Sequence, residues 1–443
     1  MNRPLAIVTI ITCVSLGIAA GVGFVLFTRT SPAALVVAQS AEVDDKIYRQ
    51  LNLLGDIFER VREDYVEKPE EEELIKSAIN GMLNSLDPHS SYLDAEAYKD
   101  MRENTSGEFG GLGIEVTLTD GVVQVVSPID DTPAQRAGMQ AGDRITHLDG
   151  ESITGITLYE AVKKMRGEVG EEIVLTVARE GITKPFKIKI VRDLIRIQPV
   201  KHEARGNVGY VRITVFNNNT TEDLHKALEE LSEELETDKV AGYILDLRNN
   251  PGGLLNQAVS VSDSFLDRGE IVSTRGRQAG NIQRFNAKKG DMTDGAPIIV
   301  LINGGAASAS EIVAGALQDH RRATILGTRS FGKGSVQTVS PIGEGGALRL
   351  TTGRYYVPSG ESIHDRGIEP DIEVKAVLKE DEDAEVEARA EGEEDEDETS
   401  AVYYYVPRDK EEDAQINYAM KLLQAVQEER LKVTEASNNN NVN

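Results

Sequence analysis

Short apolar runs alternate with amphipathic segments from Val208 to Thr328, and this alternation limits the fold more than any other feature of the chain. The apolar runs VGYVRITVF, VAGYILDL, PIIVLI and RATILGT are predicted to be strands. Between them lie segments with helical periodicity, TEDLHKALEELSEEL, LLNQAVSVSDSFL and ASEIVAGALQDH. This order predicts an α/β core at residues 194–375, closed by a strand pair at GALRLTTGRYYV.

Two other patterns precede the core. Residues 103–193 contain short strands separated by turns, including GLGIEVTL, GVVQVVSPI and EEIVLTVAREG, with one helix at TLYEAVKKMRG. The length of this segment suits one small β-rich domain. Residues 42–102 carry apolar residues at helical spacing, from Ile47 to Leu83, and are predicted to be a helical region.

Residues 1–41 are predicted to direct export. An apolar stretch from Leu5 to Phe27, followed by Arg29, is long enough to span a bilayer as a helix. A small-residue site at Ala38–Ser40 follows, as in a cleaved secretory signal. An uncleaved membrane anchor and a cleaved signal therefore both remain open, and either one predicts that the rest of the chain is exported.

Charge is distributed unevenly along the chain. Its net charge of −26 argues against nucleic acid as a partner. An acidic run at 379–400 belongs to a predicted solvated linker, residues 376–410. A helix at 411–433 is expected to dock on the core or to mediate self-association, and the tail 434–443 is predicted to be disordered. The single cysteine, Cys13, excludes a disulfide within the chain.

A lysine between glycines, in GTRSFGKGSVQT, resembles part of a phosphate-binding loop. Gly334 stands where that loop needs a hydroxyl for magnesium, and the strand-like sequence after Lys333 offers no helix N-terminus for a phosphate. Nucleotide hydrolysis is therefore disfavoured. A lysine bordered by glycines and Phe331 can instead lie in an apolar site, where burial lowers its pKa and frees the amine to act as a base.

The candidate nucleophile is Ser308, in the glycine-rich turn NGGAASASE before a helix. Such a turn can expose a serine beside free amides and the positive end of a helix dipole. With Glu311 the same serine forms a capping box, which many helices carry without any chemistry. Ser308 and Lys333 are 25 residues apart, so a serine–lysine dyad is feasible, but spacing alone leaves the choice open. A triad with Asp246 and His320 is disfavoured because His320 suits the polar end of its helix.

The segment from NGGAASASE to FGKGSVQT closely resembles the active-site segment of the carboxyl-terminal processing peptidases, also called tail-specific proteases. The motifs LDLRNNPGGLL and YYVPSGESIHDRGIEPDI extend this resemblance over roughly residues 45–375. It implies that Ser308 is the nucleophile, Lys333 the general base and Gln337 the residue that orients the lysine. Ser310 is the alternative nucleophile, which the 25-residue spacing disfavours. The resemblance also implies an α/β (α+β) core similar to the crotonase and Clp-type protease sheets.

The same resemblance identifies residues 103–193 as a PDZ domain. Its carboxylate-binding loop would be FGGLGIEV, with substrate contacts from Gly110, Gly111, Leu112, Gly113 and Ile114. Backbone amides in such a loop can capture a terminal carboxylate while the peptide adds as a strand to a sheet edge, although the glycines alone would also suit an ordinary tight turn. Arg166 is similar to an arginine that senses bound substrate and links the PDZ domain to the catalytic site, and a solvated cation is the alternative.

Together these features predict an exported, periplasmic serine endopeptidase that recognises protein C-termini and cleaves with a serine–lysine dyad. Backbone amides of Gly252 or Gly253 and of Ala309 are expected to hold the oxyanion. The sequence has no H-E-x-x-H motif or clustered histidine pair, so neither a metal nor another cofactor is expected. Expected partners are proteins or peptides with free C-termini and a second copy of the chain; an adaptor protein and the inner membrane, through residues 5–27, are further candidates. The alternative is a catalytically inactive PDZ scaffold or chaperone, against which the intact dyad argues.

Overall fold

The computed structural model describes residues 32–119, 121–235, 240–278, 280–343, 345–376, 406–407 and 412–440. These residues form two compact units, within Met1–Ser77 and within Ala78–Asn443. The predicted anchor or signal at 5–27 and the acidic run at 379–400 lie outside the described residues. Among the helices that are described, none is both long and apolar enough to cross a membrane.

The first unit is helical, as predicted. It holds α1 (Pro32–Asp64) and the beginning of α2 (Glu71–Asn84). α1 begins N-terminal to the predicted start at residue 42. Three glutamates in the first turn of α2 complement the positive end of its dipole. Apolar side chains that give α1 its periodicity, among them Ile47 and Leu51, are exposed, and Phe58 is partly buried.

Two short elements follow α2 in the second unit, β1 (Ser91–Leu93) and α3 (Ala95–Ser106). β1 is a strand inside the region 42–102 that was predicted to be helical, and α3 begins in that region but was not predicted as a separate helix. Asp94 caps α3 by accepting a hydrogen bond from the Ala97 N–H at 2.8 Å, and Gly107 ends the helix with a φ of 75°. α3 buries no residue, so hydrophobic periodicity gave no signal for it.

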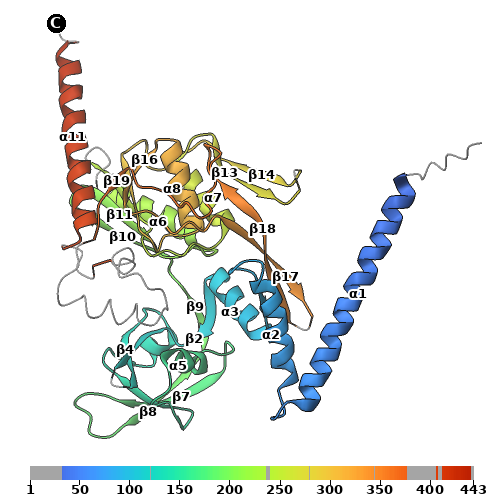
Figure 1. Cartoon of the computed structure of the whole chain (residues 1–443). Helices are drawn as coiled ribbons and strands as arrows, with labels where there is room; N and C mark the ends of the chain where they lie inside the picture. Colours follow the sequence, from blue (N-terminus) through green and yellow to red (C-terminus); the bar gives the residue numbers. More distant parts are fainter. Residues whose placement is uncertain are drawn as a thin grey trace, which may run out of the picture. The chain divides into compact units, whose positions relative to one another are not determined.

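The β-rich unit contains a six-stranded antiparallel sheet and two helices (Figure 1). Its elements are β3 (Ile114–Thr119), β4 (Val122–Pro128), α4 (Pro133–Arg136), β5 (Arg144–Leu148), β6 (Glu151–Ser152), α5 (Leu158–Met165), β7 (Glu172–Ala178) and β8 (Phe186–Val191). The order β3-β4-β5-β7-β8, with β6 on β5, leaves β3 at an edge. β2 (Glu108–Gly111) pairs with β9 (Asp193–Arg196) where the chain enters and leaves the unit.

The α/β core is built on a second six-stranded sheet, as predicted. Its strand order is β10 (Val200–Arg205), β11 (Val208–Ile213), β12 (Gly242–Asp246), β15 (Ile298–Ile302), β16 (Ala323–Gly327) and β19 (Ile372–Glu373). β10 runs antiparallel to β11, and the other neighbours are parallel. Alternate side chains such as Val211 and Val300 pack with α6 (Thr220–Glu234), α7 (Leu255–Asp263) and α8 (Ala309–Asp319).

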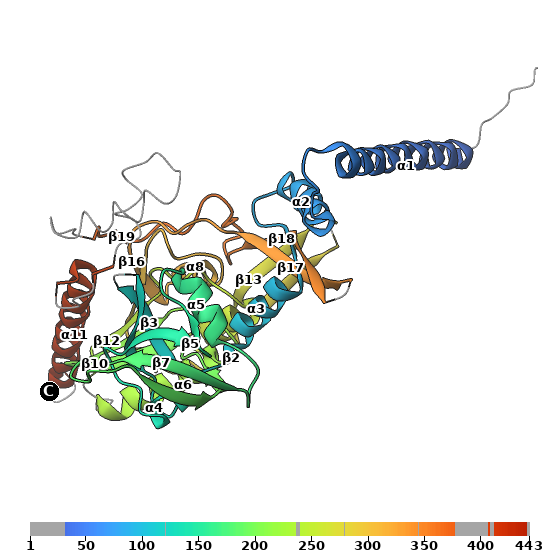
Figure 2. The ribbon, with the colours of Figure 1, turned by 90° about the horizontal axis from the view of Figure 1, so that it is seen from below.

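The C-terminal helix covers the other face of this sheet (Figure 2). Tyr210 and Leu301 pack with Ile416 of α11 (Ala414–Asn440), so the helix docks on the core, which was one of its two predicted roles. The prediction that residues 434–443 are disordered was wrong for 434–440, which continue the helix. An existing helix gains one hydrogen bond per added residue, and Ala, Ser and Asn tolerate helical geometry well enough to extend it.

A five-stranded antiparallel sheet centres on β18 (Gly346–Tyr356). β18 pairs with β1, β13 (Glu270–Gly276) and β17 (Ser335–Ile342), and β14 (Ile282–Asn286) pairs with β13. The prediction of a strand pair at GALRLTTGRYYV was therefore wrong, because the segment is one long strand. Gly353 lies inside it, where a Cβ would come 3.0 Å from the carbonyl oxygen of Arg275. The glycine permits a close approach of strands and does not make a turn.

Candidate active site

Ser308 occupies the turn between β15 and α8. Its φ of 54° is positive, which is uncommon for a residue that carries a Cβ, and its ψ is −109°. The residue is 9% exposed. Such strained turns are found at functional sites, and the first N–H groups of the helix that follows have no partner within the helix. This backbone can therefore present a hydroxyl beside unpaired amides.

Glu311, in the first turn of α8, joins the serine turn to the lysine loop. Its Oε2 accepts hydrogen bonds from the backbone N–H of Ser308 at 2.7 Å and of Lys333 at 2.9 Å. Its Oε1 accepts from the Gly332 N–H at 2.7 Å and from the Ser330 hydroxyl at 2.5 Å. Burial raises the pKa of Glu311, and the four hydrogen bonds oppose that rise. One carboxylate thus fixes the backbone of both predicted dyad residues.

Lys333 is partly buried in the loop between β16 and β17. Burial lowers the pKa of its ammonium, the charge of Arg349 lowers it further, and Glu311 opposes the change. A lysine with a lowered pKa holds more of the neutral amine that can act as a base. In the described residues, Lys333 and Ser308 are connected through Glu311, and no hydrogen bond joins Lys333 Nζ to Ser308 Oγ. Catalytic hydrogen bonds often close only when substrate binds.

Gln337 lies on β17 directly opposite Thr351 of β18. Its Nε2 donates to Ser335 Oγ at 2.8 Å and to Thr351 Oγ1 at 3.3 Å. Both N–H groups of the amide are then used, and Oε1 is left as an acceptor. The predicted contact between Gln337 and Lys333 is not formed among the hydrogen bonds of the described residues.

The loop after β12 approaches the serine turn. A Cβ on Gly252 would lie 2.8 Å from the Cβ of Ser308 and 2.9 Å from the nitrogen of Ala309, so only glycine fits there. The Gly252 N–H donates to Oδ1 of Asn250 at 2.9 Å. Gly253 and Ala309 donate no backbone hydrogen bond within the described part of the chain. Of the predicted oxyanion donors, Gly252 is therefore engaged, and the amides of Gly253 and Ala309 are available.

The alternative catalytic residues have structural contacts. The Ser310 hydroxyl is buried and donates to a backbone carbonyl of the loop after β12 at 2.9 Å. His320 Nε2 lies 2.7 Å from the carbonyl oxygen of Glu270. Asp246 is fully buried and binds the guanidinium of Arg248 at 2.9 Å and 2.7 Å. The Ser310 hydroxyl is therefore engaged with the backbone, and no hydrogen bond of the described residues joins Asp246 to His320.

The predicted carboxylate-binding loop connects β2 to β3. Gly110 and Gly111 belong to β2 and pair with β9, so the connecting residues are Leu112 and Gly113, and Ile114 begins the edge strand. Gly113 has a φ of 76°, and a Cβ there would come 2.2 Å from the Cβ of Thr132. The glycine is required by its conformation and by this close approach.

Arg166 follows α5 and contacts two other elements. Its guanidinium lies 4.3 Å from the ring centroid of Phe109, and its Nη1 lies 3.4 Å from Oε2 of Glu103 on α3. Its Nε is buried and has no hydrogen-bond partner in the described residues. Arg166 therefore joins α5 to α3, while 32% of its side chain stays exposed, so its role in sensing substrate stays a prediction.

Family models match three parts of the chain: peptidase family S41 at residues 207–374, a PDZ domain at 110–190, and the activating protease CtpB N-terminal domain at 17–97. The chain is 56% identical over 413 residues to the carboxy-terminal-processing protease of Bartonella bacilliformis, a match that covers 90% of this chain and 94% of that protein. The chain belongs to peptidase family S41.

Other relatives of this S41 peptidase agree. It is 36% identical over 351 residues to the carboxy-terminal processing protease CtpA of Bacillus subtilis, covering 79% of this chain and 73% of that protein. A solved structure of the photosystem II D1 C-terminal processing protease matches with 33% identity and a TM-score of 0.43, covering 71% of this chain and 86% of that one. The family models and the two sequence relatives confirm the predicted family, the PDZ domain and the assignment as a peptidase, and the sheets described above confirm the α/β fold.

Arg349 of the S41 peptidase was not predicted to lie near the site. It stands on β18 opposite Val339 of β17, and its charge lowers the pKa of Lys333. Its Nε is buried and has no partner among the described residues. No local motif could identify Arg349, because it reaches the lysine by strand pairing.

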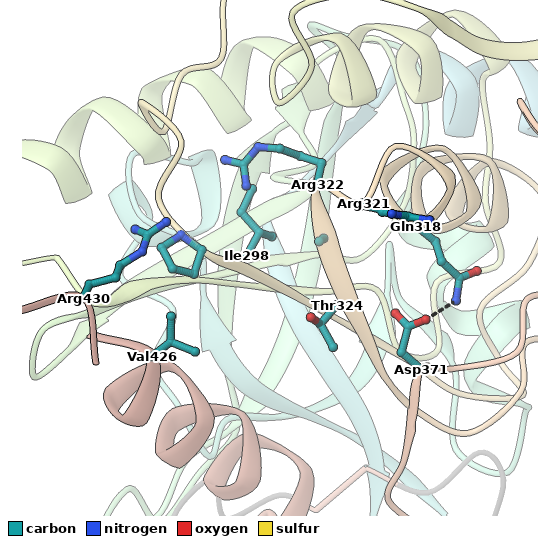
Figure 3. A pocket seen from close by; sticks show the side chains of 10 residues that line it. Ile298, Gln318, Arg321, Arg322, Thr324, Asp371, Val426 and Arg430 are labelled. Carbon is teal, nitrogen blue, oxygen red and sulfur yellow. Dashed lines mark hydrogen bonds between the residues drawn. The ribbon is translucent and has the colours of Figure 1, made fainter. Parts of the chain in front are cut away.

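A separate pocket of about 450 Å³ lies between the sheet and α11. Figure 3 shows Ile298, Thr324, Val426 and Arg430 around it, with Gln318 donating to Asp371 at 2.9 Å. Ile298 is the first residue of β15, whereas Ser308 follows the last one, so the pocket is at the opposite end of the parallel strands. Across the described residues, no group of three or more His, Cys, Asp or Glu side chains is arranged to hold a metal ion.

Proposed function

We propose that this S41 peptidase is an exported serine endopeptidase that processes protein C-termini with a Ser308–Lys333 dyad. The observation that carries the proposal is the Glu311 carboxylate, which accepts hydrogen bonds from the backbone of both residues. The lowered pKa of Lys333 supports its role as the base. Carboxy-terminal processing, named for the Bartonella and Bacillus relatives, supports the substrate class.

Catalysis proceeds through an acyl-enzyme. The neutral Lys333 amine, oriented by Gln337 Oε1, takes the proton of Ser308 Oγ as that oxygen attacks the scissile carbonyl carbon. Negative charge develops on the carbonyl oxygen, where the N–H groups of Gly253 and Ala309 stabilise it. The C–N bond then breaks, and Lys333 returns the proton to the leaving amine. Water attacks the acyl carbon with Lys333 again as base, releasing the new C-terminal carboxylic acid and Ser308.

The PDZ domain is proposed to bind the C-terminus of the substrate. Backbone amides of Leu112 and Gly113 would hold the terminal carboxylate, and the peptide would pair with the edge strand β3. Partly buried apolar side chains, Ile114 on β3 and Val162 on α5, suit an apolar C-terminal residue. Arg166 would report occupancy to α3 through its contact with Glu103.

Export and self-association complete the proposal. The apolar segment 5–27 supports delivery to the periplasm, with attachment to the inner membrane where that segment is retained. Exposed apolar side chains on α1, such as Ile47 and Leu51, support a homo-oligomer in which they are covered. An adaptor protein could use the same surfaces.

The test is cleavage of an unfolded protein that ends in apolar residues. The wild type should cleave it, and Ser308→Ala should not, because the nucleophile is lost. Ser310→Ala is the matched control in the same turn and should retain cleavage. The alternative, a PDZ scaffold without activity, predicts that the wild type binds the free C-terminus and leaves the chain intact.

A further inference from the structure

The turn LDPHSSYL lies on the strand pair that carries Gln337. Pairing of β1 with β18 brings the turn there. The carboxylate of Asp87 accepts from the N–H of His89 at 2.8 Å, the N–H of Ser90 at 2.9 Å, the Ser90 hydroxyl at 2.8 Å and the Thr351 hydroxyl at 3.2 Å. The Thr351 hydroxyl in turn accepts from Gln337 Nε2 at 3.3 Å. Asp87, Thr351 and Gln337 therefore form a continuous chain of hydrogen bonds.

The negative charge of Asp87 determines which group donates and which accepts in each of these hydrogen bonds. Burial raises the pKa of Asp87, but its hydrogen bonds outweigh burial, so the pKa lies below the ordinary value and the group is ionised. An ionised carboxylate can only accept, so the single proton of the Thr351 hydroxyl must point toward Asp87. Thr351 Oγ1 can then only accept from Gln337, which must present its NH₂ group.

The consequence for Gln337 is a fixed amide. Its second N–H is used by Ser335 Oγ at 2.8 Å, so Oε1 points away from both hydroxyls. If the amide were reversed, Gln337 Oε1 and Asp87 would compete for the one proton of Thr351. His89 of the same turn interacts with the lysine: burial lowers the pKa of His89, and the charge of Lys333 lowers it further.

We propose that Asp87 is a positioning residue for the peptidase reaction, which acts through Thr351 to fix the amide of Gln337 so that Oε1 faces the Lys333 amine. The proposal rests on the proposed dyad and on the lysine-orienting role of Gln337. It makes the segment before β1 part of the catalytic machinery, although Asp87 contacts neither substrate nor nucleophile. Asp87, which lies 264 positions before Thr351 in the sequence, would then contribute to turnover.

Steady-state kinetics on a peptide substrate test the proposal. In Asp87→Asn the side chain can donate as well as accept, so the donor and acceptor roles of Thr351 and Gln337 are no longer fixed. kcat should fall about tenfold, the value of one hydrogen bond, while KM stays unchanged because substrate binding is untouched. Thr351→Val should have the same effect. Thr352→Val is the matched control, because the Thr352 hydroxyl also forms a hydrogen bond between the strands, with Thr338 at 2.6 Å, but takes no part in the hydrogen bonds that connect Asp87 to Gln337. This variant should retain kcat.

A double-mutant cycle separates positioning from a structural role. In a Gln337→Ala background the amide is absent, so adding Asp87→Asn should change kcat by less than about twofold. The same tenfold fall in both backgrounds would overturn the proposal, as would a wild-type kcat in Asp87→Asn. Thermal melting is measured in parallel, and if Asp87→Asn unfolds, Thr351→Val carries the cycle. Failure of the dyad itself is distinguishable, because Ser308→Ala would then still cleave.

Discussion

Replacing Glu311 by glutamine should loosen the connection between the serine turn and the lysine loop. The carboxylate accepts on both oxygens, whereas an amide offers one acceptor oxygen and two N–H donors. In one orientation the new NH₂ would face the backbone N–H groups of Ser308 and Lys333, which cannot accept. In the other it would face the Gly332 N–H and the Ser330 hydroxyl, and the hydroxyl can adapt by accepting. The second orientation is expected, because it leaves one backbone N–H unsatisfied instead of two.

The size of the effect follows from these contacts. A hydrogen bond to a charged group contributes about 1.5–3 kcal/mol, and a buried donor left without a partner costs about 1–3 kcal/mol. Glu311→Gln should therefore lower the free energy of unfolding by about 2–3 kcal/mol. Glu311→Ala leaves three buried backbone N–H groups without an acceptor and should lower the free energy of unfolding by about 5 kcal/mol or more. Misplacing Ser308 or Lys333 by about 1 Å should reduce kcat by about 100-fold.

Urea unfolding and kcat, measured on the same preparations, test this reasoning. Glu369→Gln is the control, because that glutamate is on the surface near the same loop, 4.0 Å from Arg329, and its loss should change stability by less than about 0.5 kcal/mol. Wild-type stability and kcat in Glu311→Gln would refute the coupling of turn and loop. Lower stability with an unchanged kcat would mean that Glu311 supports the fold and does not align the dyad.

The remaining predictions concern the charged groups and the PDZ loop. kcat should rise with pH, because the neutral lysine is the active form, with a midpoint below the ordinary lysine value of 10.5; a midpoint at that value would contradict the lowered pKa of Lys333. Arg248→Ala removes the cation that pairs with the buried carboxylate of Asp413 and leaves that of Asp246 with the longer contact to Arg212 at 3.5 Å, so it should lower the free energy of unfolding in urea by about 3–5 kcal/mol. Because the pKa of Asp246 is lowered to about 2, the stability that its ion pair with Arg248 contributes is fully present above pH 3.8 and is lost as the pH falls through about 2. An equal free energy of unfolding at both ends of that pH range would contradict this. A peptide with a free apolar C-terminus should stimulate cleavage of a second substrate more than its amidated form, and equal stimulation would exclude carboxylate sensing.

The core could be predicted because its strands are buried on both faces. Runs such as IIVLI in β15 are then apolar without interruption. β18 was harder to predict, since Thr351, Thr352 and Gly353 interrupt its apolar pattern and resemble a turn. α3 gave no apolar signal, and only its caps, Asp94 and Gly107, mark it in the sequence.

The candidate site could be inferred from the sequence only where its residues stand in recognisable motifs. Ser308 and Lys333 stand in the motifs that carry the family resemblance, since their spacing alone left the choice open, and Glu311 was visible only as a helix cap. Strand pairing through β17, β18 and β1 brings Arg349 near Lys333 and Asp87 near Gln337, so their positions depend on strand register that no local pattern specifies. The hydrogen bonds of Gln337 likewise depend on side chains that the fold brings beside it.

Labelling with a serine-directed phosphonylating probe tests the central claim, a Ser308 nucleophile activated by Lys333, most directly. Peptide mapping by mass spectrometry after reaction near neutral pH should place the adduct on Ser308. Lys333→Met preserves the length of the side chain but removes the base, and should lower the labelling rate to near background, whereas Ser310→Ala should be labelled as the wild type is. An adduct on another residue, or undiminished labelling of Ser308 in Lys333→Met, would contradict the dyad.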